Sequence, residues 1–165
     1  MNSTGIIRKI DDLGRIVLPK ELRRHLNINP GDDFQIILDN NKIILERYSY
    51  LKNHEKDILK IIESFINVTN YSINLVINNE IVNKNNIKIL DEIINIIKER
   101  KIYIKEEIQN YKIANEFAEE GRLIIFPIVI NSDLLGSIII ISKENINNLL
   151  NTAKIINNLI KNYYI

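Results

Sequence analysis

The stretch TGIIRKIDDLGRIVLPKELRR, residues 4–24, decides the fold of the first part of this chain. Two runs rich in β-branched residues, 6–10 and 15–18, are typical of short strands. The letters DDLG between them indicate a tight connection, in which Gly14 can take a positive φ without steric cost. Pro19 then predicts the start of a helix, because the N–H group that proline lacks would be unpaired there anyway. The stretch therefore predicts a hairpin followed by a helix.

The predicted helix, KELRRHL, carries its positive charge on one side. Leu22 and Leu26 are four residues apart and share an inner face, which leaves the cations projecting outward. His25 beside Leu26 is expected to be a partly buried packing residue. The outward cations are Lys20, Arg23 and Arg24.

A second hairpin is predicted further along the chain. The letters NPGD at 29–32 form a turn signal, because Pro fixes φ and Gly follows it. The runs FQIIL at 34–38 and KIILE at 42–46 then flank the turn at 39–41. Four short strands and a two-turn helix bury too little surface to offset their ordering entropy. We therefore expect residues 1–50 to be completed by a second copy of the chain.

Positive charge is concentrated at the beginning of the chain. The net charge is +1, but residues 1–25 carry an excess of +3, residues 26–50 sum to −2 and residues 51–165 sum to zero. Four of the six cations in the first segment are Arg, whose fork of donors suits bidentate contact with phosphate or a guanine edge. On charge alone, an ordinary solvated surface is the simpler interpretation.

With Pro30-Gly31-Asp32, the stretch 4–24 resembles the AbrB/SpoVT family of transition-state regulators, in register over nearly all of residues 1–50. The resemblance implies DNA binding and an AbrB-type swapped-hairpin β-barrel, made by two chains that interleave their hairpins. It implies DNA contacts by Arg8, Arg15, Arg23 and Arg24. Lys9 and Lys20 are interpreted as auxiliary phosphate contacts, with plain solvation as the alternative.

Beyond residue 50, predicted helices alternate with strands. The helices cover 54–67, 87–100 and 144–163, and the strands cover 72–77, 80–82, 102–105, 123–130 and 134–141. Asn85 or Asn86 is expected to cap the second helix, and the polar segment 106–120 is left unassigned. The near-continuous Ile and Leu content of the last two strands, around a turn at 131–133, predicts that both faces of the sheet are covered.

This order of elements predicts an α+β domain over residues 51–165, including the linker helix 54–67. The layout is similar to a GAF domain, a small-molecule sensor module, in element order, length and position, without diagnostic residues. The similarity implies effector sensing or oligomerisation. Tyr103, Tyr111 and Phe117 are as well explained by core packing as by a pocket, so no ligand residues are named.

Both terminal helices of this domain carry apolar stripes at three-and-four spacing. The stripes are Ile58, Leu59, Ile62, Phe65 and Ile66 in the first helix, and Leu149, Ala153, Ile156, Ile160 and Tyr163 in the last. Two such helices side by side can form a four-helix contact with a partner. We expect a dimer through residues 1–50 and a homotetramer through these helices, unless both stripes are internal.

Composition argues against several classes of protein. The chain has no Cys, so it has no disulfide, thiolate metal site or cysteine nucleophile, which is typical of the cytoplasm. His25 and His54 offer no metal-ligand spacing, and no Ser-His-Asp pattern or Gly-rich phosphate loop is present. We expect neither a metal site nor enzymatic activity. No stretch reads as a membrane span or a signal peptide.

With the resemblance to the AbrB/SpoVT family, the expectation is a cytoplasmic, nucleoid-associated transcription regulator. The resemblance implies that it binds double-stranded DNA, with AT-rich promoter regions as the expected targets, and that it controls sporulation genes. The rival is an antitoxin of a toxin–antitoxin pair, which shares the swapped-hairpin fold but typically continues into a disordered acidic tail. Residues 51–165 are neutral and strongly patterned, which counts against that. No cofactor is identifiable. An unknown small-molecule effector of the C-terminal domain, the operator sequence and the sign of regulation are left open.

Overall fold

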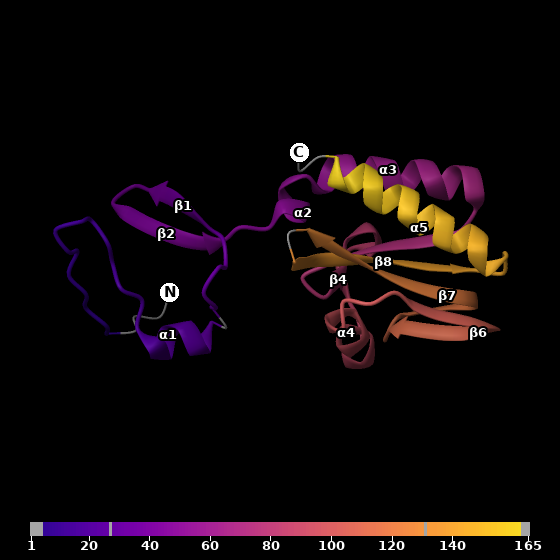
Figure 1. The fold of residues 1–165 in the computed structure, drawn as a ribbon, viewed down its shortest axis with the longest axis horizontal. Coiled ribbons are helices and arrows are strands. Elements are labelled where there is room, and N and C mark those ends of the chain that lie inside the picture. Colours follow the sequence, from indigo (N-terminus) through magenta and orange to yellow (C-terminus); the bar gives the residue numbers. More distant parts are fainter. Residues whose placement is uncertain (1–4, 27, 131, 163–165) are drawn as a thin grey trace. The chain divides into compact units, whose positions relative to one another are not determined.

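The computed structural model describes residues 5–26, 28–130 and 132–162 (Figure 1). The chain divides into two units, Met1–Tyr48 and Ser49–Ile165. Three residues that the sequence placed in the first motif, a turn and the last helix lie outside the described residues: Thr4, Asn131 and Tyr163.

The first unit contains one short helix and one β-hairpin. Helix α1 spans Lys20–His25, strand β1 spans Phe34–Asp39 and strand β2 spans Lys42–Arg47. The strands are antiparallel, with Asp39 opposite Lys42 at the turn. Asn40 takes up φ 51 there, a left-handed conformation that Asn adopts more readily than most residues. The predicted second hairpin is confirmed.

The expected strands at 6–10 and 15–18 do not form in the single chain. The connection between them is hydrogen-bonded: the N–H of Asp11 donates to the carbonyl of Arg15 at 3.0 Å, and that of Gly14 donates to the carbonyl of Asp11 at 2.9 Å. Gly14 has φ 74, as the tight connection requires. The reason is that a strand needs a neighbouring strand for its backbone groups, and one chain alone supplies none to these segments.

Helix α1 differs from its prediction in what it buries. Pro19 is the residue before the helix rather than its first residue, and its carbonyl accepts the N–H of Arg23 at 3.0 Å. Leu22 is half-buried, but Leu26 is 56% exposed and His25 is exposed, so the expected packing role of His25 was wrong. Pro19 is the only buried residue among the described residues 5–48, so one copy of this unit has almost no core.

The second unit is an α+β domain around a six-stranded antiparallel sheet with the order β5-β4-β3-β8-β7-β6. Its strands are β3 (Ser72–Ile77), β4 (Glu80–Ile81), β5 (Ile87–Lys88), β6 (Tyr103–Ala114), β7 (Phe117–Ile130) and β8 (Asp133–Ser142). Its helices are α2 (Tyr50–Asn53), α3 (Glu55–Thr69), the 3-10 turn η1 (Val82–Lys84), α4 (Asp91–Lys98) and α5 (Ile146–Lys161). Figure 1 shows α3 and α5 together on one side of the sheet and α4 on the other.

Each face of this sheet has its own core. On the central strand β8, Ile138 and Ile140 join the cluster under α3 and α5, whereas Ile139 and Ile141 join the cluster that includes α4. All four side chains are 0% exposed. Because side chains on both faces of β8 are buried, the predicted covering of both faces is confirmed. Such burial explains why this strand has a run of consecutive apolar residues.

The stripes of α3 and α5 are mostly internal. Ile58 and Ile62 of α3 are 0% exposed, and the other members of that stripe pack partly buried against the same cluster. The α5 stripe, Leu149, Ala153, Ile156 and Ile160, is also 0% exposed. Both helices therefore pack these residues against their own sheet. This is the alternative given above, in which the stripes are internal and do not form a contact with a partner.

Two predictions around the second helix need correction. Helix α4 begins at Asp91 rather than 87, and Asn85 and Asn86 do not cap it. These asparagines have φ 56 and 57, whereas an N-cap residue is typically extended. The unassigned segment 106–120 forms most of β6, the turn after it and the start of β7, and β6 is polar because it lies at the sheet edge.

A one-turn helix that the sequence did not reveal fixes the start of the second unit. Leu51 of α2 is 0% exposed and packs with the cluster under α3 and α5. It does so beside Gly136 of β8, where an added Cβ would come within 2.7 Å of Leu51 Cδ1 and 2.4 Å of the Val76 carbonyl oxygen. The glycine therefore leaves the space that α2 occupies.

Candidate nucleic-acid interface

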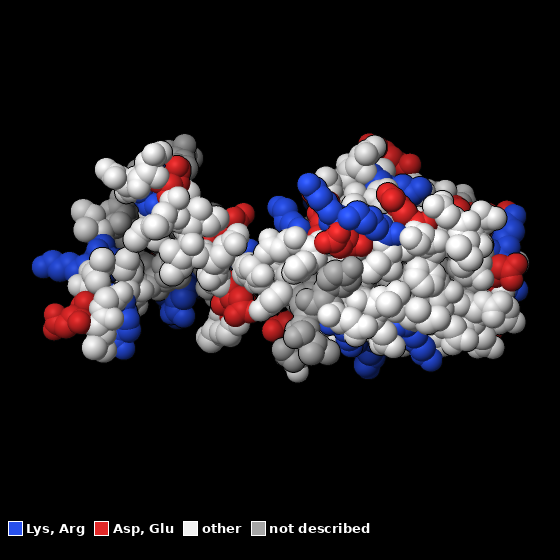
Figure 2. All heavy atoms as spheres, turned by 90° about the horizontal axis from the view of Figure 1, so that it is seen from above, with Lys and Arg blue, Asp and Glu red and all other residues white. Residues whose placement is uncertain are grey.

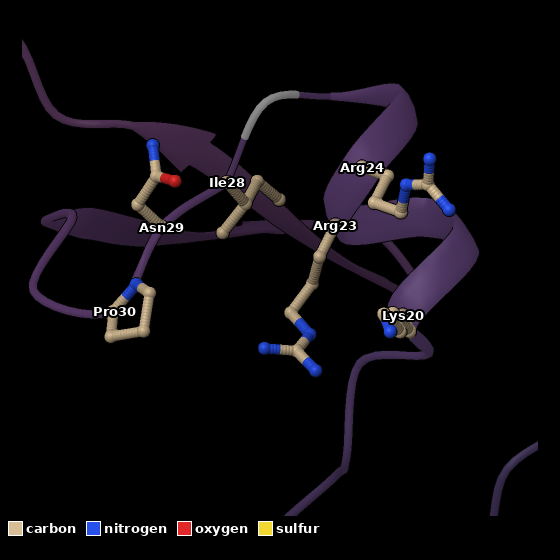
Figure 3. Close-up of a pocket in the computed structure, with 6 residues that line it drawn as sticks. All are labelled: Lys20, Arg23, Arg24, Ile28, Asn29 and Pro30. Carbon is tan, nitrogen blue, oxygen red and sulfur yellow. The ribbon is translucent and has the colours of Figure 1, made fainter.

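Helix α1 presents three of the predicted site residues. Lys20, Arg23 and Arg24 are all exposed, and none of the described residues of α1 is buried. Together with Ile28, Asn29 and Pro30 they line an open hollow (Figure 3). Arg23 and Arg24 leave the helix in different directions in this view, so the helix offers cations to more than one side.

Opposite α1, the hollow is lined by the turn at residues 29–32, which is held by hydrogen bonds. The N–H of Asp32 donates to the carbonyl of Asn29 at 3.2 Å, and the N–H of Asn29 donates to Asp32 Oδ2 at 2.9 Å. Gly31 supplies φ 94 inside the turn. Arg47, at the end of β2, donates through Nη2 to the same carboxylate at 3.1 Å. The position of Pro30 opposite α1 is therefore held by the hairpin.

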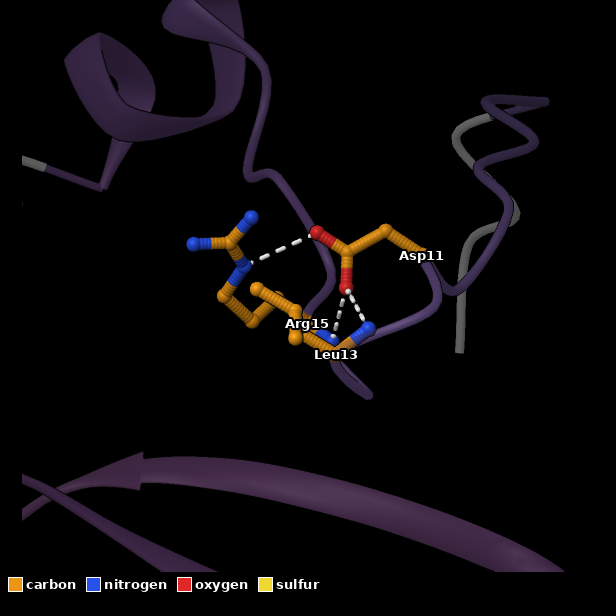
Figure 4. A network of polar contacts seen from close by, with 3 residues as sticks. All are labelled: Asp11, Leu13 and Arg15. Carbon is orange, nitrogen blue, oxygen red and sulfur yellow. Dashed lines mark hydrogen bonds and ion pairs between the residues drawn. The ribbon is translucent and has the colours of Figure 1, made fainter.

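Arg15 is held by the carboxylate of Asp11 (Figure 4). Its Nε donates to Asp11 Oδ2 at 2.8 Å, and its backbone N–H donates to Asp11 Oδ1 at 2.8 Å. The N–H of Leu13 donates to the same Oδ1 at 3.0 Å. These backbone and guanidinium bonds lower the pKa of Asp11 below its ordinary value, because each favours the ionised carboxylate.

The two remaining predicted cations lie on the segment before this turn. Arg8 donates through Nη1 to the carbonyl of its neighbour Ile7 at 2.9 Å, and its side chain is exposed. Lys9 is exposed and makes no hydrogen bond or ion pair with another residue that the structure describes. Both are accessible to a ligand.

The structure thus arranges the six predicted residues in two groups. Three surround the hollow at α1, and three lie on residues 5–18, with no hydrogen bond or ion pair between the groups among the described residues. Figure 2 shows Lys and Arg side chains standing out from the unit on the left, with Asp and Glu side chains among them. The six predicted residues therefore form two separate basic groups.

Sequence reasoning placed Asp11 in the tight connection at 11–14 but missed its contact with Arg15. The signal was present, because Asp at the start of a turn hydrogen-bonds the backbone N–H groups that follow it. It also missed the brace between Asp32 and Arg47, which joins residues distant in sequence. No local pattern reveals such a contact.

The first unit also exposes many large apolar side chains. The described part of the first unit exposes Ile7 (86%), Leu38 (77%), Leu13 (73%), Val17 (72%) and Ile36 (70%), among others. Extended exposed apolar surface is uncommon on monomeric soluble proteins.

Other kinds of site find no support in the described part of the chain. No group of three or more His, Asp or Glu side chains there could hold a metal ion. No described helix has the length and apolar character of a membrane span. In the second unit, the side-chain oxygens of Asn74, Ser137 and Asn157 are buried without a hydrogen-bond partner, but the first two side chains are 0% exposed, so no open pocket reaches them.

Comparison with known proteins adds relatives for both units. Residues 7–53 match the family described as antidote-toxin recognition MazE, bacterial antitoxin. Stage V sporulation protein T of Bacillus subtilis (strain 168) is 27% identical over 157 residues, which cover 87% of this chain and 86% of that protein.

Two further relatives from the same organism match a shorter part of the chain. The transition state regulatory protein AbrB is 56% identical and the putative transition state regulator Abh is 52% identical, each over 48 residues or 29% of this chain. These matches cover 50% and 52% of the two proteins, so the chain spans about half of each. A solution structure of the N-domain of the transcription factor abrB is 55% identical, covers 30% of this chain and 94% of that domain, and has a TM-score of 0.28.

Proposed function

From an N-terminal domain of the MazE/AbrB type, we propose that the protein is a DNA-binding transcription regulator of the AbrB/SpoVT type that controls sporulation genes. The observation that carries the proposal is the 56% identity to a transition state regulator over 48 residues. The similarity to stage V sporulation protein T, which extends over 87% of the chain, supports the role in sporulation.

The proposed DNA contacts are the exposed cations of the first unit. Arg8, Arg15, Arg23 and Arg24 contact phosphates or base edges, and Lys9 and Lys20 add phosphate contacts. Helix α1 has six residues, too few to lie along a major groove as a recognition helix. Readout therefore depends on DNA shape as well as base identity, and Arg favours the narrow minor groove of A-tracts. The expected targets are AT-rich promoter regions.

The proposed unit of DNA binding is a dimer. One copy of residues 5–48 buries only Pro19 among its described residues and exposes large apolar side chains on both the loop and the hairpin. A second copy that pairs with residues 6–10 and 15–18 would satisfy their backbone groups and cover these side chains together. Interleaved hairpins of the swapped-hairpin type meet both needs, and dimerisation doubles the basic set.

The proposed role of the second unit, residues 51–165, is GAF-like effector sensing or oligomerisation. Its sheet, with α3 and α5 on one face and α4 on the other, fits the predicted α+β layout. A tetramer would use the outer side of α5, where Ile155 is 51% and Leu159 is 37% exposed one turn apart. The internal stripes of α3 and α5 are not available for that contact. We place the protein in the cytoplasm, associated with the nucleoid.

An antitoxin is the second candidate, because the family that matches residues 7–53 includes antitoxins. The second unit counts against it. An antitoxin tail that folds on its toxin would be disordered by itself, whereas Ser49–Ile165 forms a sheet with two cores.

A genome-wide binding map of the tagged protein during sporulation tests the proposal. We expect peaks at AT-rich promoter regions of sporulation genes, and their loss in the variant R23A/R24A. The matched control is K101A/K112A, which removes two exposed cations from the second unit instead. A map without peaks, or one that both double variants change alike, would contradict the proposed function.

A further inference from the structure

Asp11 holds Arg15 in a particular orientation. Oδ2 of the carboxylate accepts a hydrogen bond from Nε of the guanidinium. Oδ1 accepts hydrogen bonds from the backbone N–H groups of Arg15 and Leu13. One acidic side chain thus fixes both the backbone and the head group of the same arginine. Neighbouring Asp12 makes no such contact with any described residue.

The bond to Nε determines which part of the guanidinium remains available. Arg has five N–H donors in a planar fork, and the two terminal nitrogens carry four of them. In Figure 4 the guanidinium is joined to Asp11 through Nε, and no dashed line joins either terminal nitrogen to that carboxylate. The Arg15 side chain is 69% exposed despite the ion pair. The terminal donors are therefore free to meet two acceptors at once, such as two phosphate oxygens or the O6 and N7 of guanine.

On the basis of the proposed function, we infer that Asp11 is a positioning residue for DNA recognition, which pre-orients Arg15 and fixes the turn that carries it. Orientation before binding matters because a free Arg side chain loses rotamer entropy when a ligand immobilises it. Because Asp11 already restricts the Arg15 side chain in the unbound protein, less rotamer entropy is lost when DNA binds. Asp11 raises affinity although its charge repels the DNA backbone.

This opposition of charge and position makes the inference testable with matched variants. D11A and D12A each remove one negative charge from adjacent residues of the same loop, so long-range electrostatics alone would tighten DNA binding about equally in both. We expect D12A to bind as tightly as wild type or more tightly. We expect D11A to bind about tenfold more weakly, the size of one lost oriented charge-assisted contact.

Two further variants separate the turn from the arginine. D11N keeps an oxygen that can accept the two backbone N–H groups but loses the ion pair with Arg15, so we expect most of the loss seen in D11A. In an R15A background, D11A should cost nothing further, because the residue that it positions is gone. A residue that only stabilised the loop would still weaken binding in that background.

The measurement is fluorescence anisotropy with an AT-rich duplex and the 165-residue chain, with circular dichroism to check that each variant folds. Equal tightening by D11A and D12A would overturn the inference, as would an equal loss from D11A with and without Arg15. If wild type binds no duplex, the proposed function itself fails. That result is distinct from a wild type that binds while Asp11 and Asp12 behave alike.

Discussion

Short polar side chains replace backbone partners in both units. In the second unit, Asn83 accepts the N–H of Leu75 at 2.9 Å through Oδ1 and donates to the carbonyl of Ile73 at 2.7 Å through Nδ2. Its amide therefore pairs with β3 as a neighbouring strand would, at the point where β4 no longer reaches. Asp11 does the same for the loop of the first unit.

The Asn83 amide is expected to contribute measurably to stability. N83A leaves two partly buried backbone groups of β3 without partners, which costs roughly 1–3 kcal/mol of the free energy of unfolding. Urea denaturation of wild type and variant measures the difference. The control N151A, at an exposed position of α5, should change the free energy by less than about 0.5 kcal/mol. Equal effects of the two variants would contradict this role.

The contact between Asp11 and Arg15 also predicts a titration. Because the pKa of Asp11 is lowered in the folded chain, its stabilising contribution is present above the ordinary Asp pKa and is lost as the pH falls through the lowered value. NMR titration of the Asp11 carboxyl should show a midpoint below that of an Asp in a model peptide. R15A should move it upward. A midpoint at the ordinary value in the wild type would mean that the bonds do not persist in solution.

Among the elements, those stabilised by their own pattern were predictable and those that depend on distant partners were not. Strand β3 was predicted at Ser72–Ile77, as observed, because it is rich in Ile, Leu and Val and ends at turn-forming asparagines. The segments 6–10 and 15–18 have strand composition but no strand partner within one chain. The start of α4 was missed because Asn85 and Asn86 resemble caps in sequence, although their left-handed backbone excludes that role.

The same distinction applies to the candidate site. The family resemblance indicated Arg15 as a contact residue, but its partner Asp11 is known only from the loop geometry. The burial of Leu51 likewise depends on Gly136, which lies 85 residues further along the chain. The spacing of apolar residues in a sequence indicates whether a segment is a helix or a strand. It does not show which residues come into contact once the chain has folded.

Helix α2 is expected to be an integral part of the second unit. L51A removes a side chain that is 0% exposed, and the resulting cavity costs about 2–5 kcal/mol of the free energy of unfolding. The matched control V68A truncates an apolar side chain of α3 that is 84% exposed and should have little effect. Thermal or urea unfolding followed by circular dichroism compares them. If L51A is as stable as V68A, α2 is only a linker.

We expect the whole molecule to contain more than one copy of the chain. We propose that a partner completes the core of the first unit and that a second contact forms through α5. I155K/L159K places two charges on the exposed side of α5 without touching the buried stripe. Light scattering should show a tetramer for wild type and a dimer for the variant. A dimeric wild type, or a variant that remains tetrameric, would contradict this contact.

DNA binding by paired basic units is tested most directly by the dependence of the binding constant on salt concentration. If about six to eight cations of a dimer meet phosphates, the logarithm of the binding constant should fall against the logarithm of salt with a slope of roughly −5 to −7, about −0.9 per contact. R23A/R24A should flatten this slope, and K101A/K112A should leave it unchanged. A wild-type slope near zero, or the same slope in R23A/R24A as in wild type, would contradict the account.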